Sequence, residues 1–259
     1  MEILTSRTNP AVKAACALKE SGERKKTGCF LLEGARLCAD AAYNRVEILT
    51  FFVSEKAREK YREEAALLER TAEKSFLISE SVADKLSDTK NSQQFFAVCR
   101  EKKLSAEINP DGMYVMTDNI QNPDNLGAVV RTAEAMGADG LIINSGCDIY
   151  SPKALRASMG ALLRFPVIVT GEAVTLLDTL RAQGMKIFAS VVSSDAESVS
   201  LADKSGGCVL IIGNEGNGVS GEIISAATNK ITIPMKGKAE SLNAAAAAAV
   251  LIWEFMKDR

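Results

Sequence analysis

Short, continuous apolar runs alternate with segments of helical spacing through the second part of the chain. We expect strands at residues 113–118, 140–144, 165–169, 186–192, 208–213 and 231–235. A strand with one face in water alternates apolar and polar side chains, whereas a strand covered on both faces is apolar throughout. The runs therefore predict an α/β domain whose parallel sheet is covered by helices on both faces.

Helical spacing fills the gaps between these runs. We expect helices at residues 124–136, from residue 152, at 175–183, from residue 220 and, as a long terminal helix, from residue 241. Short polar side chains cap helices by accepting hydrogen bonds from free backbone amides. Asp124 or Asn125, Ser220 and Ser241 stand where such caps are expected.

The first part of the chain repeats the alternation on a smaller scale, which suits two domains in 259 residues. We expect helices at residues 10–22, 36–42, 55–70 and 79–86, and strands at 30–32, 46–53, 74–79 and 94–100. The segment LSAEINPDG has no apolar period and contains Pro110 and Gly112. We therefore place a boundary near residues 104–110, between a domain of residues 1–105 and a domain of residues 106–259.

Charge is divided unevenly, with a net +3 on residues 1–105 and a net −5 on residues 106–259. Positive side chains gather near the N-terminus, at Lys13, Lys19, Arg24, Lys25, Lys26 and Arg36. This part is the stronger candidate for binding a polyanion, although such a cluster is more often a solvated face.

Several function classes are excluded by composition. The chain has no His, which removes Ser-His-Asp and Cys-His triads and HExxH metalloprotease chemistry. The six Cys are scattered and never form C-x-x-C, so we expect small buried side chains and neither a metal site nor a disulfide framework. We find no run of ~18 apolar residues and no signal-peptide pattern, so we expect a cytoplasmic protein.

Three loops that follow expected strands are rich in polar residues and glycine, and ligands in open α/β sheets bind beyond the carboxyl ends of strands. In the first loop, DNIQNPDNLGAVVRTAEAMG, Asn125 stands at a helix entrance and Arg131 lies among small and apolar residues. Arg131 is either an ordinary surface side chain or the partner of an anion such as a phosphate.

The second loop, GNEGNGVS from residue 213, has three glycines that either turn backbone amides toward a ligand or make a plain tight connection. It matches neither a Walker loop nor a dinucleotide fingerprint. Glu215 within it suits hydroxyl or amine groups better than phosphate. The third loop, KGKAESLN from residue 236, places Ser241, Leu242 and Asn243 at the start of an alanine-rich helix.

These three stretches, in this order, resemble the three motifs of the SpoU (TrmH-type) RNA 2′-O-ribose methyltransferases, over most of residues 113–259. The first motif matches at Asn125, at Gly127 and at residues 131–133, the second at residues 213–216, and the third at residues 233–235 and 241–243. SRTNPAVK at residues 6–13 and FLLEGARL at residues 30–37 also resemble the RNA-binding extension of that family, a small α/β domain similar to certain ribosomal proteins.

The resemblance implies a catalytic domain with a deep trefoil knot, S-adenosylmethionine as cofactor, and a homodimer formed through the C-terminal domain. The general avoidance of knots would by itself favour an ordinary doubly wound sheet. By the same resemblance, catalytic positions fall on Asn125, Arg131, Glu215, Ser241 and Asn243, and cofactor-binding positions fall on Gly213, Ile233 and Leu242. Together with the charge pattern, it assigns RNA binding to Arg7, Lys25, Lys26 and Arg36.

The implied reaction is methyl transfer to a ribose 2′-hydroxyl of structured RNA, without a metal. Ribosomal RNA is favoured over transfer RNA because the extra domain suits structured RNA. The hydroxyl proton is removed by Arg131 or by water, and a guanidinium gives up its proton only above about pH 12. Two other functions stay open: a non-catalytic RNA-binding protein on the same fold, and a nucleotide-binding phosphotransferase.

Overall fold

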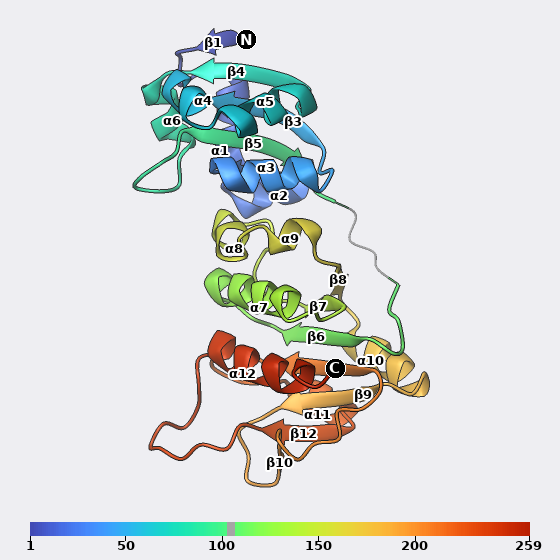
Figure 1. The fold of residues 1–259 in the computed structure, drawn as a ribbon. Coiled ribbons are helices and arrows are strands. Elements are labelled where there is room, and N and C mark those ends of the chain that lie inside the picture. The colour runs from blue at the N-terminus through green and yellow to red at the C-terminus, as the bar shows by residue number, and fades with distance from the viewer. Residues whose placement is uncertain (103–106) are drawn as a thin grey trace. The chain divides into compact units, whose positions relative to one another are not determined.

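A computed structural model describes residues 1–102 and 107–259 of the chain (Figure 1). The described residues form two compact units. Unit 1 contains residues 1–102 together with Tyr150–Arg164, and unit 2 contains residues 107–149 and 165–259. The predicted boundary near residues 104–110 lies partly outside the described residues, and the division into domains of residues 1–105 and 106–259 stays a prediction.

Unit 1 contains a five-stranded mixed sheet with the order β1-β4-β3-β5-β2, in which β5 runs antiparallel to β2 and β3. Its strands are β1 (Glu2–Leu4), β2 (Cys29–Glu33), β3 (Ile48–Val53), β4 (Lys74–Ile78) and β5 (Phe95–Arg100). Its helices are α1 (Pro10–Ala17), α2 (Ser21–Thr27), α3 (Ala35–Tyr43), α4 (Glu55–Lys60), α5 (Arg62–Thr71), α6 (Glu80–Leu86), α8 (Pro152–Ala157) and α9 (Ala161–Arg164).

Two expected helices of unit 1 are each divided in two. The helix expected at residues 10–22 ends at Ala17, and α2 begins at Ser21. Arg24, which is only 3% exposed, donates from Nη1 to the carbonyl oxygens of Leu18 and Lys19 at 2.7 Å. This buried guanidinium satisfies carbonyls left free where α1 ends. The helix expected at residues 55–70 is interrupted at Tyr61, whose φ and ψ are −114° and 57°.

Unit 2 contains a seven-stranded sheet in which every pairing is parallel, with the order β10-β12-β9-β11-β6-β7-β8. Its strands are β6 (Met113–Asp118), β7 (Gly140–Asn144), β8 (Val167–Thr170), β9 (Lys186–Ser190), β10 (Glu197–Ser198), β11 (Cys208–Ile212) and β12 (Asn229–Thr232). Its helices are α7 (Pro123–Ala135), α10 (Ala173–Ala182), α11 (Gly221–Ala226) and α12 (Ala244–Met256). The predicted parallel sheet is confirmed, whereas β1 and β10 are too short to be seen in the periodicity.

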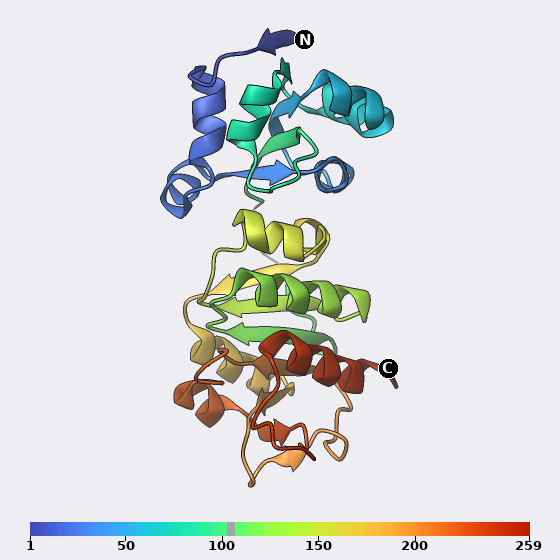
Figure 2. The same cartoon turned by 90° about the vertical axis from the view of Figure 1, so that its left-hand side faces the viewer.

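Helices cover both faces of the unit 2 sheet, as the apolar strands predict. On one face, α10 and α11 supply Leu177, Leu180 and Ile223 to a core with Ile187 and Val209 of the sheet. On the other face, α7 and α12 lie side by side (Figure 2). The trefoil knot implied by the resemblance stays a prediction.

The expected burial of the cysteines is confirmed for Cys29, Cys38, Cys99 and Cys208, whereas Cys16 and Cys147 are half-buried. Burial raises the pKa of the Cys208 thiol to about 11, although Arg259 and Lys186 act to lower it. Within residues 1–102 and 107–259, no helix is long and apolar enough to span a membrane.

Phe255 anchors α12 on the sheet by packing edge-on against Phe188, with ring centroids 5.0 Å apart and both rings buried. We expect Phe255→Ala to lower the free energy of unfolding by about 3–5 kcal/mol through loss of this buried ring. Leu201→Ala, at a side chain 76% exposed, should change it by less than about 0.5 kcal/mol. Urea unfolding followed by the fluorescence of Trp253 on α12 measures both, and equal losses would contradict this role of Phe255.

Candidate functional site

Polar loops meet at the carboxyl ends of the central strands of unit 2. The strands β6, β11, β9 and β12 all run parallel, so the loops that leave them emerge at one edge of the sheet. These loops begin after Asp118, Ile212, Ser190 and Thr232. This edge therefore brings together the three stretches singled out in the sequence.

Asp118 joins the first two loops at their base. The side chain is 3% exposed, and its Oδ1 accepts a hydrogen bond from Nδ2 of Asn144 at 2.9 Å. Its Oδ2 accepts from the backbone amide of Ser220 at 2.8 Å. Ser220 is the N-cap residue of α11, as predicted, but its own side chain makes no capping hydrogen bond. The carboxylate on β6 thus holds the start of α11.

Glu215 holds the loop that precedes α7. Its Oε2 accepts from the backbone amide of Gln121 at 3.1 Å. Its Oε1 accepts from the backbone amide of Asn122 and from Nδ2 of Asn125, both at 3.0 Å. The sequence suggested that this carboxylate serves a ligand's hydroxyl or amine group, whereas in the structure its hydrogen bonds go to the protein's own loop.

These hydrogen bonds also set the ionisation of Glu215. Partial burial acts to raise the pKa of its carboxyl, but the hydrogen bonds from Asn125, Gln121 and Asn122 outweigh burial and hold the pKa below its ordinary value. A carboxylate that accepts several N–H groups is stabilised in its charged form. Glu215 is therefore a fixed anion that organises the loop.

Asn125 continues this network into the third loop. While its Nδ2 donates to Glu215, its Oδ1 accepts from Nδ2 of Asn243 at 3.1 Å. Asn243 in turn caps α12, because its Oδ1 accepts from the backbone amides of Ala245 and Ala246. Three predicted catalytic positions, Glu215, Asn125 and Asn243, therefore form one hydrogen-bonded chain.

The helix caps differ from those expected. Asn122, with Oδ1 2.8 Å from the amide nitrogen of Asp124, caps α7 in place of Asp124 or Asn125. Asn243 takes the capping position on α12 that was expected for Ser241. Pro123 occupies the first helical position of α7 and fixes the backbone there. As a result, Asn125 is free to bridge the loops, and Ser241 lies exposed before α12.

The loop at residues 213–218 is closed by backbone hydrogen bonds in both directions between Asn214 and Gly218, each 2.9 Å long. Nδ2 of Asn214 also donates to the carbonyl oxygen of Asn119 at 2.8 Å. A Cβ atom on Gly213 would overlap the backbone of Gly218 and Val219. The closure of its own loop therefore requires a glycine at position 213, and the role of Gly213 in binding a cofactor stays a prediction.

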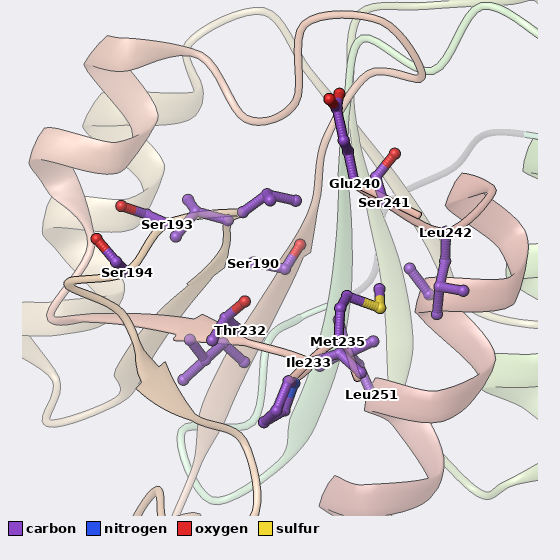
Figure 3. A pocket seen from close by; sticks show the side chains of 15 residues that line it. Ser190, Ser193, Ser194, Thr232, Ile233, Met235, Glu240, Ser241, Leu242 and Leu251 are labelled. Carbon is purple, nitrogen blue, oxygen red and sulfur yellow. The ribbon is translucent and has the colours of Figure 1, made fainter. Parts of the chain in front are cut away.

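Two adjoining pockets open between these loops, and all three predicted cofactor-binding residues line them. One has a volume of about 410 Å³ and is lined by Ile233 and Leu242 (Figure 3). The other, of about 480 Å³, is lined by Gly213, Leu242 and the Glu215 loop. Leu242 and Leu251 lie on one side of the first pocket, and Ser193 and Ser194 lie on the opposite side (Figure 3).

Sequence reasoning missed the loop after β9. Ser190, Val191, Val192 and Ser193 line both pockets. The signal was present, because this loop follows a buried strand of the same parallel sheet. It contains neither glycine nor a cluster of amides, and so it was not singled out.

Arg131 and Ser241 are placed differently from the other predicted catalytic residues. Ser241 is exposed and lines both pockets. Arg131 is exposed on α7, and no hydrogen bond or ion pair joins it to another of the described residues. Its side chain is therefore available to a group from outside this chain.

The four predicted RNA-binding residues are all exposed and belong to unit 1. Arg7 precedes α1, Lys25 and Lys26 lie on α2, and Arg36 lies in the first turn of α3. Two other members of the basic cluster have structural roles, which corrects the sequence interpretation. Arg24 is buried as described above, and Nζ of Lys19 donates to the carbonyl oxygens of Lys85 and Ser87.

Comparison with known proteins gives matches over both parts of the chain. Residues 112–253 match the SpoU rRNA Methylase family, and residues 9–97 match the MRM3-like substrate binding domain. Over 98% of each chain, the protein is 30% identical to the 23S rRNA (guanosine(2553)-2′-O)-methyltransferase RlmP of Bacillus subtilis.

Two solved structures of relatives are similar over nearly their whole length. The AdoMet-bound rRNA methyltransferase from Sinorhizobium meliloti is 28% identical with a TM-score of 0.88, covering 99% of this chain and 98% of that one. The SpoU methyltransferase AviRb from Streptomyces viridochromogenes, in complex with the cofactor AdoMet, is 27% identical with a TM-score of 0.86, covering 97% and 98%.

The lowered pKa of Glu215 predicts a pH dependence of the loop at residues 119–122. A depressed carboxyl pKa contributes stability that is fully present above the ordinary glutamate pKa and is lost as the pH falls through the lower value. The protection of the Gln121 and Asn122 amides against hydrogen exchange, measured relative to the intrinsic rate at each pH, should stay constant down to about pH 4.3 and fall below it. In Glu215→Gln these amides should exchange fast at every pH, whereas Glu222→Gln should match the wild type. Unchanged protection in Glu215→Gln would contradict the anchoring role.

The glycine loop offers a matched pair of substitutions. Gly213→Ala should destabilise the protein by about 1–3 kcal/mol, because its Cβ overlaps backbone that cannot move without opening the loop. Gly216→Ala should be tolerated, since its Cβ would meet only Oδ1 of Asn214 at 3.6 Å. Thermal unfolding compares the two, and the same melting temperature for both variants would count against this account of Gly213.

Proposed function

Because the chain belongs to the SpoU rRNA methylase family, we propose that it transfers a methyl group from S-adenosylmethionine to a ribose 2′-hydroxyl of 23S ribosomal RNA. The observation that carries the proposal is the hydrogen-bonded chain of Glu215, Asn125 and Asn243, which ties the three matching loops together beside two pockets. The relative that matches over 98% of each chain is named for a guanosine of 23S rRNA, and we propose the same RNA class here.

The two pockets fit the cofactor in size and lining. Their volumes, about 410 and 480 Å³, lie in the range of ~300–1,000 Å³ typical of small-molecule sites. Ile233, Leu242 and Leu251 supply an apolar surface for a purine ring, and the loop from Gly213 supplies backbone polar groups. When bound, S-adenosylmethionine supplies a sulfonium methyl group that is open to attack by an oxygen nucleophile.

The site residues divide into two roles. Glu215, Asn125 and Asn243 are positioning residues, because their side chains bind one another and the loops. Arg131 and Ser241 are exposed, and we assign them to the substrate. The planar guanidinium of Arg131 suits a phosphate beside the reacting hydroxyl, where it orients the ribose. The hydroxyl proton leaves through Arg131 once the phosphate is bound, or through water.

We also propose a homodimer through α7 and α12. Three α12 side chains at helical spacing, Ala246, Val250 and Trp253, are exposed, and Val250 and Trp253 are 44% and 55% exposed. Met136 at the end of α7 adds to this apolar face. An exposed apolar stripe of this kind is typical of a protein interface.

RNA binding by Arg7, Lys25, Lys26 and Arg36 is part of the same proposal, with unit 1 supplying affinity for the RNA backbone. We place the protein in the cytoplasm, where such an RNA substrate and the cofactor are found together. One measurement tests the activity and the RNA class together. Mapping 2′-O-methyl sites in total RNA with and without this gene should reveal one missing position in 23S rRNA, whereas a missing position in transfer RNA would overturn the RNA class.

Two alternative functions can be distinguished from methyl transfer by experiment. A non-catalytic RNA-binding protein would incorporate no labelled methyl group into RNA from deproteinised ribosomes. A phosphotransferase would be stabilised in a thermal-shift assay by ATP rather than by S-adenosylmethionine.

Arg131→Ala should lower the rate of methyl transfer by at least about a hundredfold, because orientation of the ribose is lost, while cofactor affinity stays within a few-fold. Arg131→Lys should be nearly as inactive, since an ammonium cannot replace a planar fork. Single-turnover methylation and calorimetry with S-adenosylmethionine measure the two effects. Near-normal turnover in Arg131→Ala would contradict the role of Arg131 in orienting the substrate.

Trp253→Glu should weaken the proposed dimer by at least about tenfold in Kd, since a charge would be buried at the centre of an apolar face. Leu201→Glu is the control, because Leu201 is also exposed, at 76%, but lies outside this face. Sedimentation equilibrium measures the association. A wild-type chain that stays monomeric, or an unchanged Kd in Trp253→Glu, would contradict the α7–α12 interface.

A further inference from the structure

A second pocket lies in unit 1. Of the residues that line it, only Arg36 has been given a functional role above. It has a volume of about 590 Å³ and is formed by α3, the loop at residues 87–94, and the turn between α8 and α9. The residues that matter for its chemistry are Arg36, Leu37, Lys90, Asn91, Arg156 and Met159. We call it the unit 1 pocket.

The loop that forms one wall of the unit 1 pocket is held in place by Glu33. The Oε1 atom of Glu33 accepts hydrogen bonds from the hydroxyl groups of Ser87 and Thr89, both at 2.7 Å. Its Oε2 accepts from the backbone amide of Asp88 at 2.9 Å. The far end of the loop is fixed by Gln93, whose Oε1 accepts from the backbone amide of Ala35 at 2.8 Å. The wall is thus built before any ligand arrives.

The opposite wall is fixed to the same elements. Nη2 of Arg156 donates to Oδ2 of Asp88 at 2.8 Å, and Arg164 pairs with Asp40 of α3 at 3.5 Å. Gly160 has a φ of +85°, and a Cβ there would meet the carboxylate of Asp40. The turn that carries Met159 therefore lies directly against α3.

The charge left for a ligand in the unit 1 pocket is positive. The two carboxylates in its lining are occupied, Glu33 by the loop and Asp40 by Arg164. Arg36 and Lys90 have no hydrogen bond or ion pair with other described residues, and both are exposed. Nη1 of Arg156 is buried and has no hydrogen-bond partner in the described part of the chain. Two exposed cationic side chains, Arg36 and Lys90, can therefore still donate to an anion, and Arg156 adds positive charge behind them.

The remaining lining adds two kinds of surface. Leu37 and Met159 are apolar, and Met159 is 42% exposed. Asn91 has both a donor and an acceptor to offer, and the amide nitrogen of Gln93 is left over from its contact with Ala35. The cavity therefore suits a nucleotide. Its apolar surface matches the face of a base, its amide groups match the polar edge of the base, and its unpaired cations match a phosphate.

We propose that the unit 1 pocket binds one unstacked nucleotide of the RNA substrate, distinct from the nucleotide that is methylated. The proposal rests on the function proposed above and adds to it a specificity site in the substrate-binding unit. Proteins read RNA sequence mainly on single-stranded loops and bulges, whose unstacked bases can enter such pockets. Asn91 reads the base edge, Leu37 and Met159 contact its face, and Arg36 and Lys90 contact the phosphate.

Methionine methyl groups report on the unit 1 pocket and on the cofactor site separately, because Met159 lines the first and Met235 lines the second. In the full-length protein saturated with S-adenosylmethionine and labelled with ¹³C at its methionine methyl groups, UMP and GMP are titrated. We expect a saturable shift of the Met159 resonance, assigned with Met159→Leu, and no shift of Met235. Inorganic phosphate and ribose 5-phosphate should shift Met159 far less. Equal shifts with phosphate alone would overturn base binding, as would no shift with either nucleotide.

Protein variants assayed with 23S rRNA then test whether the bound nucleotide belongs to the RNA substrate. We expect Asn91→Ala and Met159→Ala to raise the KM for 23S rRNA by about tenfold with little change in kcat, because a base contact is lost away from the reacting ribose. The slope of RNA affinity against salt should stay unchanged in these variants. Lys25→Ala combined with Lys26→Ala is the control, and it should flatten that slope by about one log-log unit per contact while leaving the UMP-induced shift of Met159 intact.

The outcomes distinguish this proposal from the proposed function. A wild-type protein that methylates no RNA would refute the proposed function, and RNA-induced shifts of Met159 would still test the unit 1 pocket. Tight UMP or GMP binding that RNA does not displace would identify a free nucleotide as the ligand and overturn the proposal. Normal KM values in both Asn91→Ala and Met159→Ala would overturn it as well.

Discussion

The carboxylate of Glu215 is the contact on which the arrangement of the site depends. It joins Asn125 to a loop 90 positions later in the chain, and Asn125 also accepts a hydrogen bond from Asn243, which lies 118 positions after it. Glu215, Asn125 and Asn243 are hydrogen-bonded to one another and to backbone amides, which leaves the loops little freedom to move. Because the carboxyl pKa is held below its ordinary value, the anchor is charged at neutral pH.

The parallel sheet explains why a few hydrogen bonds are enough to hold the loops of the site together. Four strands end at one edge, so their loops are already close before any side chain joins them. The pockets lie between these loops, with apolar side chains from α12 on one side and the loop after β9 on the other. Positioning and substrate contact fall to different residues: Glu215, Asn125 and Asn243 hold the frame, whereas Arg131 and Ser241 remain exposed.

The positive side chains of unit 1 likewise serve two purposes. Arg24 and Lys19 donate to backbone carbonyl oxygens and hold the ends of helices. Arg36 and Lys90 have no such partners among the described residues and line a cavity. The net charge of the first part of the chain therefore overstates what is free to meet RNA. Local hydrogen bonds decide which positive side chains remain available to bind RNA.

The sequence by itself determined the parallel sheet of unit 2, since a series of short, unbroken apolar runs such as residues 208–212, separated by segments of helical spacing, is typical of strands covered on both faces. It also singled out the three loops, through Asn125, Glu215 and Asn243. Only the tertiary structure decided what those residues contact, that Asn122 and Asn243 are the caps, and that Gly213 serves loop closure. The spacing of apolar residues indicates which faces of a helix or strand are buried, and this pattern is contained within the element itself. Hydrogen bonds between loops about a hundred residues apart depend on strand order, which no local pattern records.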